Sequence, residues 1–246
     1  MPGNTHKWSL RETMRQYEKT QKNSRDYFMS NNKVIIFGKA ETNLERHHKV
    51  EHEVFYCVTL EVVRTDGQVD HIPVLISSTI MQKKNLNNPF KGSFIEVAGQ
   101  YRSYDLINDG ARQVCLFVLA KNVSLFTKQA RIQKRMGKNV IFLDGCVADY
   151  PIIHFANDNM EVTELVLEVP RNFAKFYYIP CIMYGKYAEL ATTLRAGDYM
   201  AFYGQIQNRQ RSIYNNAFIC MCDYCTTHQV LVTDIQTSPM FRRATN

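Results

Sequence analysis

Short apolar stretches rich in valine, isoleucine, phenylalanine and tyrosine recur along the chain from Lys33 onward. Stretches of this kind, bounded by turn residues, predict β-strands. Asp66-Gly67 and Asn108-Asp109-Gly110 lie between such stretches and predict hairpin turns. In the first half, strands are predicted after Lys33 and at Val54–Val63, Ile72–Ile76, Phe94–Ala98 and Val114–Ala120. In the second half they are predicted at Val140–Leu143, Val162–Val169, Tyr178–Met183, Tyr199–Tyr203 and Ala217–Cys222.

Helical spacing interrupts this pattern at a few places. Residues 9–28 begin with Ser9 and Glu12 in capping-box spacing and predict an N-terminal helix. A second helix is predicted over 186–195, with Tyr187, Leu190, Ala191 and Leu194 on its buried face and Gly197 after its end. Residues 80–88 occupy the same slot in the first half, and 130–138 form a short basic helix or linker.

The two halves repeat each other. Arg64 and the pair Ile72-Pro73 recur as Arg171 and Ile179-Pro180, and Gly38 recurs as Gly145, all displaced by 107 residues. Gly99-Gln100 recurs as Gly204-Gln205, displaced by 105. A unit of about one hundred residues can hold its own core, so the chain is interpreted as two copies of one domain.

Five strands with one helix after the third is the strand order of an OB barrel. The predicted fold class is therefore all-β with minor helices, namely two tandem five-stranded OB-fold barrels plus an N-terminal helix. The predicted boundaries are a basic helical segment 1–31, a first OB domain 32–127, a basic linker 128–138, a second OB domain 139–228 and a tail 229–246.

Composition adds a bias in charge. The net charge is +7, while residues 1–33 carry seven Lys/Arg against three acids and residues 128–138 carry five Lys/Arg and no acid. Basic segments beside near-neutral domains suit a polyanion partner, and a solvated charged face is the alternative. No apolar run reaches the roughly 20 residues of a membrane span, and the seven cysteines favour reduced thiols, so we expect a soluble cytoplasmic protein without disulfides.

Several short motifs, in this order and spacing, resemble the bacterial single-stranded DNA-binding proteins. In the second copy they are Asn139–Gly145, Tyr177–Pro180, Tyr184–Glu189, Leu194–Gly197 and Gly204–Arg209. In the first copy, Asn32–Gly38, Asp70–Pro73, Lys91-Gly92 and Gly99–Arg102 are similar. The resemblance implies four OB domains to an assembly, which a homodimer of this chain would supply, and sequence-tolerant stacking of bases on strand aromatics.

Carried over by position, the resemblance implies base stacking by Phe173, Tyr178 and Tyr184, and phosphate contacts by Arg209 and Arg211. The first copy has His71 and Ser77 where the second has Tyr178 and Tyr184, with Tyr101, Arg102 and Tyr104 as its compensating residues. We therefore expect the second copy to be the stronger base stacker. The chain ends in Phe241-Arg242-Arg243-Ala244-Thr245-Asn246 rather than in the family's acidic, aromatic tip, which puts partner recruitment by such a tip in doubt.

The residues themselves support part of this site. Neighbours in a strand point to opposite faces, so either Tyr177 or Tyr178 must lie outside the core. An outward ring beside Arg171 and Lys175 suits a stacked base with its phosphate on a cation, and Arg64 repeats Arg171 in the first copy. The alternative is that Tyr177 or Phe173 covers a barrel end or a dimer interface.

A metal site and catalysis are the other chemistries to weigh. Cys220, Cys222, Cys225 and His228 could complete a zinc shell, but the alignment puts Cys220 and Cys222 opposite Val118 and Ala120, at apolar strand positions. No metal or cofactor is therefore expected, and His47, His48 and His52 are interpreted as solvated loop residues. Enzyme motifs are absent from the sequence, so no catalysis is expected.

The leading hypothesis is a bacterial, non-catalytic protein that coats single-stranded DNA in replication, recombination or repair, with RNA as an open alternative. The alternative from another class is an OB-fold interaction or assembly subunit of a replication or mobile-element complex.

Overall fold

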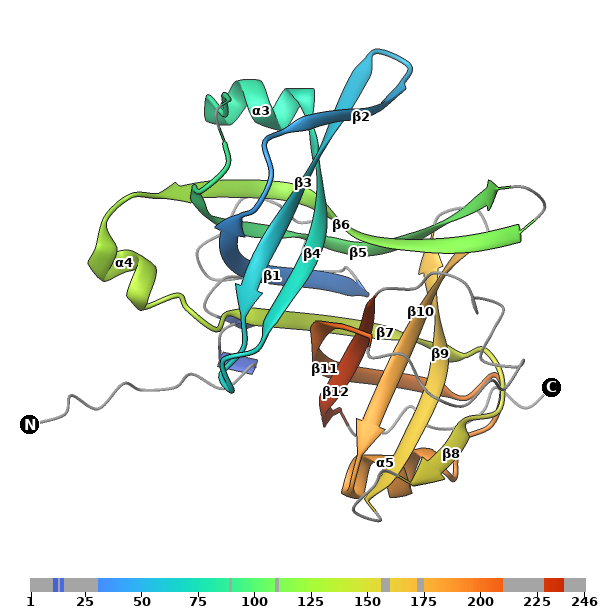
Figure 1. The fold of residues 1–246 in the computed structure, drawn as a ribbon. Coiled ribbons are helices and arrows are strands. Elements are labelled where there is room, and N and C mark those ends of the chain that lie inside the picture. Colours follow the sequence, from blue (N-terminus) through green and yellow to red (C-terminus); the bar gives the residue numbers. More distant parts are fainter. Residues whose placement is uncertain are drawn as a thin grey trace, which may run out of the picture.

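The fold is mostly β, as predicted, with minor helices (Figure 1). The computed structural model describes residues 11, 12, 14, 15, 31–88, 90–108, 111–155, 160–171, 175–209 and 228–236. The strands are β1 Asn32–Ala40, β2 Glu45–Val50, β3 Glu53–Val63, β4 Val69–Ser77, β5 Phe94–Asn108, β6 Ala111–Phe126, β7 Asn139–Val147, β8 Ile152–Phe155, β9 Glu161–Arg171, β10 Lys175–Tyr184, β11 Tyr199–Asn208 and β12 His228–Ile235. The helices bounded within this part are α3 Ser78–Lys84, α4 Gln129–Gln133 and α5 Lys186–Ala191.

The strand pairings close two rings, which we call the first ring and the second ring. The first ring runs β1-β3-β4-β6-β5 and returns to β1, and the second runs β7-β9-β10-β12-β11 and returns to β7. In each ring one pairing is parallel, β4 with β6 and β10 with β12, and the others are antiparallel. Strands β2 and β8 extend the sheet outside the rings, beside β3 and β9.

The registers of the two rings confirm the repeat position by position. Lys39 pairs with Glu61 in the first ring, and Cys146 pairs with Glu168 in the second, each displaced by 107. Val34 opposite Gly99 corresponds to Ile141 opposite Gly204, at displacements of 107 and 105. The sequence repeat is thus a repeat of hydrogen-bonded structure.

The last strand of the second ring differs from the prediction. Val118 pairs with Val74, and the corresponding partner of Cys181 is Val230, so Val118 corresponds to Val230 and not to Cys220. The predicted strand Ala217–Cys222 lies outside the described residues, and residues 229–235, predicted as tail, belong to β12. Strands β2 and β8 were not predicted. All six side chains of β2 are exposed, which leaves no apolar alternation to detect, and β8 has only four residues.

Recurring glycines mark the places where strands cross closely. A Cβ on Gly99 would lie 2.1 Å from the carbonyl oxygen of Leu119, and one on Gly145 would lie 2.2 Å from that of Glu168. Neither position has room for a side chain, because the obstructing atom is backbone. These glycines therefore allow the close approach of β5 to β6 and of β7 to β9.

The two rings join along β1 and β7 with approximate two-fold symmetry. Val34 pairs with Ile141, its own equivalent in the repeat, at the centre of this antiparallel contact. The flanking hydrogen bonds come in equivalent pairs: Asp144 N to Asn31 O with Phe37 N to Lys138 O, and His71 N to Asn208 Oδ1 with Tyr178 N to Ser103 Oγ. Each ring thus contributes equivalent strands and hydrogen bonds to the junction.

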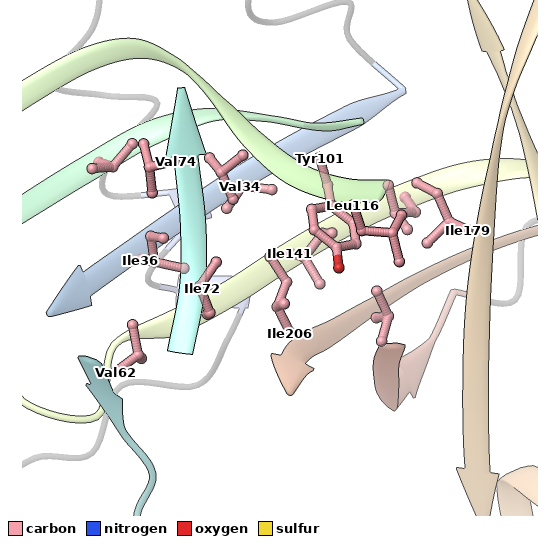
Figure 2. Packing of buried hydrophobic residues seen from close by; sticks show 14 of the residues in the cluster. Val34, Ile36, Val62, Ile72, Val74, Tyr101, Leu116, Ile141, Ile179 and Ile206 are labelled. Atoms are coloured by element: carbon pink, nitrogen blue, oxygen red, sulfur yellow. The ribbon is translucent and has the colours of Figure 1, made fainter. Parts of the chain in front are cut away.

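The core is continuous across this junction. Buried side chains of both rings form one cluster, in which Val34 and Ile72 of the first ring and Ile141 and Ile179 of the second take part (Figure 2). Met14 is buried in a smaller cluster with Ile35, Ala98 and Val140. Of the predicted N-terminal helix 9–28, only residues 11, 12, 14 and 15 are described, and these four are helical.

The internal helices occupy the predicted slots but are shorter than predicted. In α5 the buried residues are Ala188 and Ala191, whereas Leu190, predicted on the buried face, is exposed. Tyr187 and Leu194 pack partly buried against the core, as predicted. Gly197 has a φ of +84° after the helix, which is the left-handed conformation expected there.

Candidate nucleic-acid interface

An aromatic run lies on the first ring, formed by side chains of β2, β3, β5 and β6. His48 stacks on Phe55 at 4.8 Å between ring centroids, and His47 lies edge-on to His48 at 4.9 Å and to Tyr104 at 6.4 Å. Tyr104 in turn contacts Phe117 at 5.5 Å. His47, His48 and Tyr104 are exposed and the two phenylalanines are half-buried, so the run presents ring faces and edges to solvent.

Of the predicted first-copy residues, Tyr104 belongs to this run and Tyr101 does not. Tyr101 is fully buried within the core cluster shown with Leu116 and Ile141 in Figure 2. The prediction that Tyr101 contacts bases is therefore wrong, because no base can reach its ring. Its place in the repeat explains this, because Tyr101 is equivalent to the core residue Ile206. The Tyr101 backbone N–H donates to the side chain of Asn32, and the Ile206 backbone N–H donates to that of Asn139.

A cationic cleft of about 640 Å³ lies between the rings and brings together four predicted residues, Arg102, Arg171, Lys175 and Tyr177. The guanidinium carbons of Arg102 and Arg171 lie 5.5 and 5.3 Å from the centroid of the Tyr177 ring. Lys121, which was not predicted, completes the group of cations. Among the described residues, no ion pair joins any of these four cations to a carboxylate within 4.0 Å.

Of the four cations, Arg102 is half-buried, whereas Lys121, Arg171 and Lys175 are exposed. Desolvation lowers the pKa of the Arg102 guanidinium; nearby Tyr177 raises it and nearby Arg171 lowers it. Desolvation also lowers the pKa of Lys121, with Arg102 adding to that effect and Glu53 opposing it. The Nε of Arg102 is buried and makes no hydrogen bond in the described part of the chain, although its Nη2 donates to Gln100 at 2.7 Å. An unneutralised cation group of this kind favours an anion.

Tyr177 and Tyr178 point to opposite faces of β10, as predicted. Tyr177 is 6% exposed and lines the cleft, while Tyr178 is 37% exposed on the other face. Tyr184 is 38% exposed at the end of the same strand. Burial raises the pKa of Tyr184, nearby Glu164 raises it further, and Arg64 lowers it.

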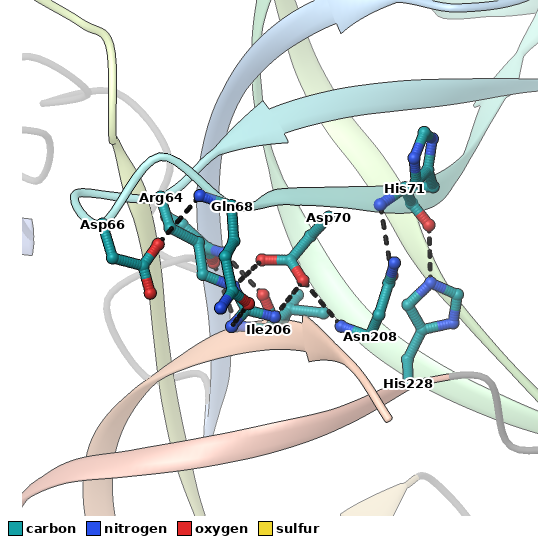
Figure 3. A network of polar contacts seen from close by, with 9 residues as sticks. Arg64, Asp66, Gln68, Asp70, His71, Ile206, Asn208 and His228 are labelled. Carbon is teal, nitrogen blue, oxygen red and sulfur yellow. Dashed lines mark hydrogen bonds and ion pairs between the residues drawn. The ribbon is translucent and has the colours of Figure 1, made fainter. Parts of the chain in front are cut away.

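Arg64 and His71 lie in a polar network at the junction of the rings, which we call the Asp70 network (Figure 3). The Arg64 guanidinium donates to both carboxylate oxygens of Asp70, with Nε 2.6 Å from Oδ2, and the Asn208 backbone N–H donates to Oδ1 at 2.7 Å. His71 accepts through its carbonyl from His228 Nε2 at 2.6 Å, and its ring contacts Glu41 at 2.8 Å. Because the Arg64 guanidinium is paired with the fully buried Asp70 carboxylate, Arg64 has a structural role.

The remaining predicted residues are placed as follows. Arg209 forms an ion pair with Glu164 at 3.1 Å, and both side chains are largely buried. Phe173, Arg211 and the cysteines of the rejected zinc set, Cys220, Cys222 and Cys225, lie outside the described residues. Burial lowers the pKa of His228, the fourth member of that set. The described residues contain no cluster of three or more potential metal ligands.

Sequence reasoning missed Lys121, His47, His48, Phe55 and Phe117. The two histidines were assigned to a loop because β2 has no apolar face. Asn108 pairs with Ala111, as expected for the predicted hairpin. Tyr104 on β5 lies beside Phe117 on β6 because of the register along the whole of these two strands. Among the described helices, none has the length and apolar character of a membrane span.

Comparison with solved structures identifies the fold. The wild-type single-stranded DNA-binding protein from Thermus aquaticus matches with a TM-score of 0.65 and 15% identity, over 88% of this chain and 97% of that one. A deletion variant of the same protein matches with a TM-score of 0.62 and 16% identity, over 84% and 94%. The N-terminal domain of PriB from Thermoanaerobacter tencongensis is 32% identical over 40% of this chain and 99% of its own, with a TM-score of 0.34.

No family model and no curated protein sequence matches the chain. The chain has the fold of a bacterial single-stranded DNA-binding protein, so the resemblance noted in the sequence is confirmed at the level of the fold.

Proposed function

We propose that this chain, whose fold is that of the bacterial single-stranded DNA-binding proteins, binds single-stranded DNA without catalysis. The observation that carries the proposal is the aromatic run Phe55-His48-His47-Tyr104-Phe117 on the first ring. Stacking on such rings is tolerant of sequence, because every base has a π-face, and contributes about 1–3 kcal/mol per base.

The position of the run fits an extended ligand. Its five rings come from four strands, so they form a track across the strands rather than a closed pocket. A track of successive ring contacts suits successive bases of one strand, whereas a small ligand would need enclosure. In contrast with the sequence expectation, we infer that the first repeat is the stronger base stacker.

We further propose that each ring is an OB barrel, with the first domain at 32–127, the linker at 128–138 and the second domain extended from 139–228 to residue 235 by β12. The closed five-strand pairing with one parallel pair supports this assignment. A cytoplasmic homodimer with four such barrels, acting in bacterial DNA replication, recombination or repair, remains a prediction from the resemblance.

The test is binding of fluorescent oligo-dT at low salt, followed by anisotropy, with Tyr104→Ala as the variant. Tyr104 is exposed and contacts two other rings of the run, so its loss should weaken binding by about tenfold or more, from the stacking energy of one to two bases. Tyr150→Ala is the matched control, because Tyr150 is 69% exposed and lies between β7 and β8, away from the run.

The outcomes separate the hypotheses. Wild-type protein that fails to bind oligo-dT at low salt contradicts the proposal, as does equal loss of affinity in the two variants. Competition with oligo-U decides between DNA and RNA as the preferred ligand, because ring stacking alone accepts both. If Tyr104→Ala abolishes binding of a protein partner in a pulldown but leaves oligo-dT affinity unchanged, the alternative function as a protein-interaction subunit is favoured instead.

A further inference from the structure

The approximate two-fold symmetry of the rings creates two equivalent positions beside the β1–β7 junction, one on each side. Residues of β3–β4 face β11–β12 on one side, and residues of β9–β10 face β5–β6 on the other. Equal hydrogen bonds mark both, His71 N to Asn208 Oδ1 and Tyr178 N to Ser103 Oγ, each of 3.1 Å. The two positions are therefore equivalent in the repeat, so their side chains can be compared one by one.

One position is closed by the Asp70 network. Asp70 is fully buried and neutralises Arg64, and His228 is buried against the His71 carbonyl (Figure 3). The charges at this position are therefore matched inside the protein. An external anion would have to displace a buried carboxylate that already accepts from Arg64 and from the Asn208 N–H.

The other position is the cationic cleft, and four residues that differ from their equivalents in the repeat produce it. Tyr177 stands at the equivalent of Asp70, as shown by their pairing with Val169 and Val62, so Arg171 has an aromatic ring where Arg64 has a carboxylate. Arg102 stands at the equivalent of Gln207, at a displacement of 105. Lys121 and Lys175 add two more charges at the same position.

We propose that the cationic cleft is a phosphate site. The equivalent position on the other side of the junction is closed by the Asp70 network, so phosphate binds on one side only. The fork geometry of Arg102 and Arg171 suits phosphate oxygens, and the buried Arg102 Nε lacks a hydrogen-bond acceptor within the described chain. Resting on the function proposed above, the ligand is the backbone of a single strand that passes between the two rings.

The experiment compares two double variants that remove the same charge. Arg171→Gln with Lys175→Gln alters two exposed cations of the cleft, and Lys83→Gln with Lys84→Gln removes two exposed cations from α3. The first readout is the dependence of oligo-dT affinity on salt. For single strands the slope of log K against log salt is about −0.7 per phosphate contact, so two lost contacts reduce the slope by about 1.4. Between roughly 50 and 200 mM salt this amounts to about a sevenfold smaller loss of affinity.

The second readout is thermal unfolding with inorganic pyrophosphate, which needs no nucleic acid. We expect pyrophosphate to raise the Tm of the wild type and of the α3 variant but not of the cleft variant. Circular dichroism of the free protein shows whether the double substitution perturbs folding. If it does, Lys121→Gln serves as the second cleft variant.

The two proposals fail in different ways. Where oligo-dT binds, equal slopes in the cleft and α3 variants overturn the phosphate site and leave DNA binding standing. Where oligo-dT does not bind, a pyrophosphate-induced rise in Tm that the cleft variant lacks supports the site alone, with free phosphates as its ligand. In that case, absence of any pyrophosphate effect on the wild type overturns the site as well.

Discussion

Asp70→Asn tests how much the buried Arg64–Asp70 ion pair stabilises the fold. Asp70 is fully buried and accepts from Arg64 Nε and Nη2 and from the Asn208 backbone N–H. Removing one partner of a buried pair costs about 3–5 kcal/mol, because the remaining charge is left without its counterpart. Arg64 keeps a 20% exposed side chain that water can reach, and Asn retains one acceptor oxygen, so we expect a loss of about 2–3 kcal/mol.

The assay is thermal unfolding, in which a loss of this size lowers Tm by about 5–10 °C for a chain of this length. Asp66→Asn is the matched control, because Asp66 is exposed in the turn and accepts from the Gln68 N–H at 3.0 Å. Arg64→Gln alone leaves a buried carboxylate unpaired and should cost as much as Asp70→Asn or more. The double variant should cost clearly less than the sum. Additive losses, or an Asp70→Asn protein with the Tm of the wild type, would refute the reasoning.

Three further predictions concern the fold. Gly99→Ala should cost about 2 kcal/mol or more by denaturant unfolding, because its Cβ would stand 2.1 Å from a carbonyl oxygen, whereas Gly92→Ala, in open space at a φ of +87°, should cost about 1 kcal/mol. Met14→Ala should cost about 2–3 kcal/mol, since Met14 is 2% exposed; an unchanged unfolding free energy would show that this segment does not dock on β1 and β7. Burial, aided by Asp144, raises the pKa of Tyr199 to about 12, so the folded state favours the neutral phenol. The resulting stability is complete below about pH 10 and lost as pH rises through about 12, and Tyr199→Phe should flatten that decline in unfolding curves recorded across this range.

The repeat made most of the framework predictable from the sequence. The equal displacement of Gly38 and Gly145 follows from a physical constraint, since each would place a Cβ within 2.6 Å of a carbonyl oxygen of the crossing strand. Such constraints keep residue types fixed, and the strands between them inherit the register. Strand β12 was not predicted because it is displaced from β6 by 112 residues. No motif around Val118 and Val230 reveals this change in displacement.

The site was less predictable because its chemistry depends on contacts between the halves. Arg64 and Arg171 are the same residue in the repeat, yet one is neutralised by Asp70 and the other faces Tyr177. Alternation along a strand states that Tyr177 and Tyr178 point in opposite directions, but it does not state which of them meets the other ring. The aromatic run was missed for another reason: it lies within the first half, and β2 joins it only through pairing with β3.

Photocrosslinking of iodouridine-substituted oligo-dT, followed by mass spectrometry of the crosslinked peptides, tests the central claim most directly. We expect crosslinks to Tyr104 and to His47 or His48 in the aromatic run, all of which are exposed to solvent. Crosslinks confined to exposed aromatics elsewhere, such as Tyr150 and Phe155, would contradict it.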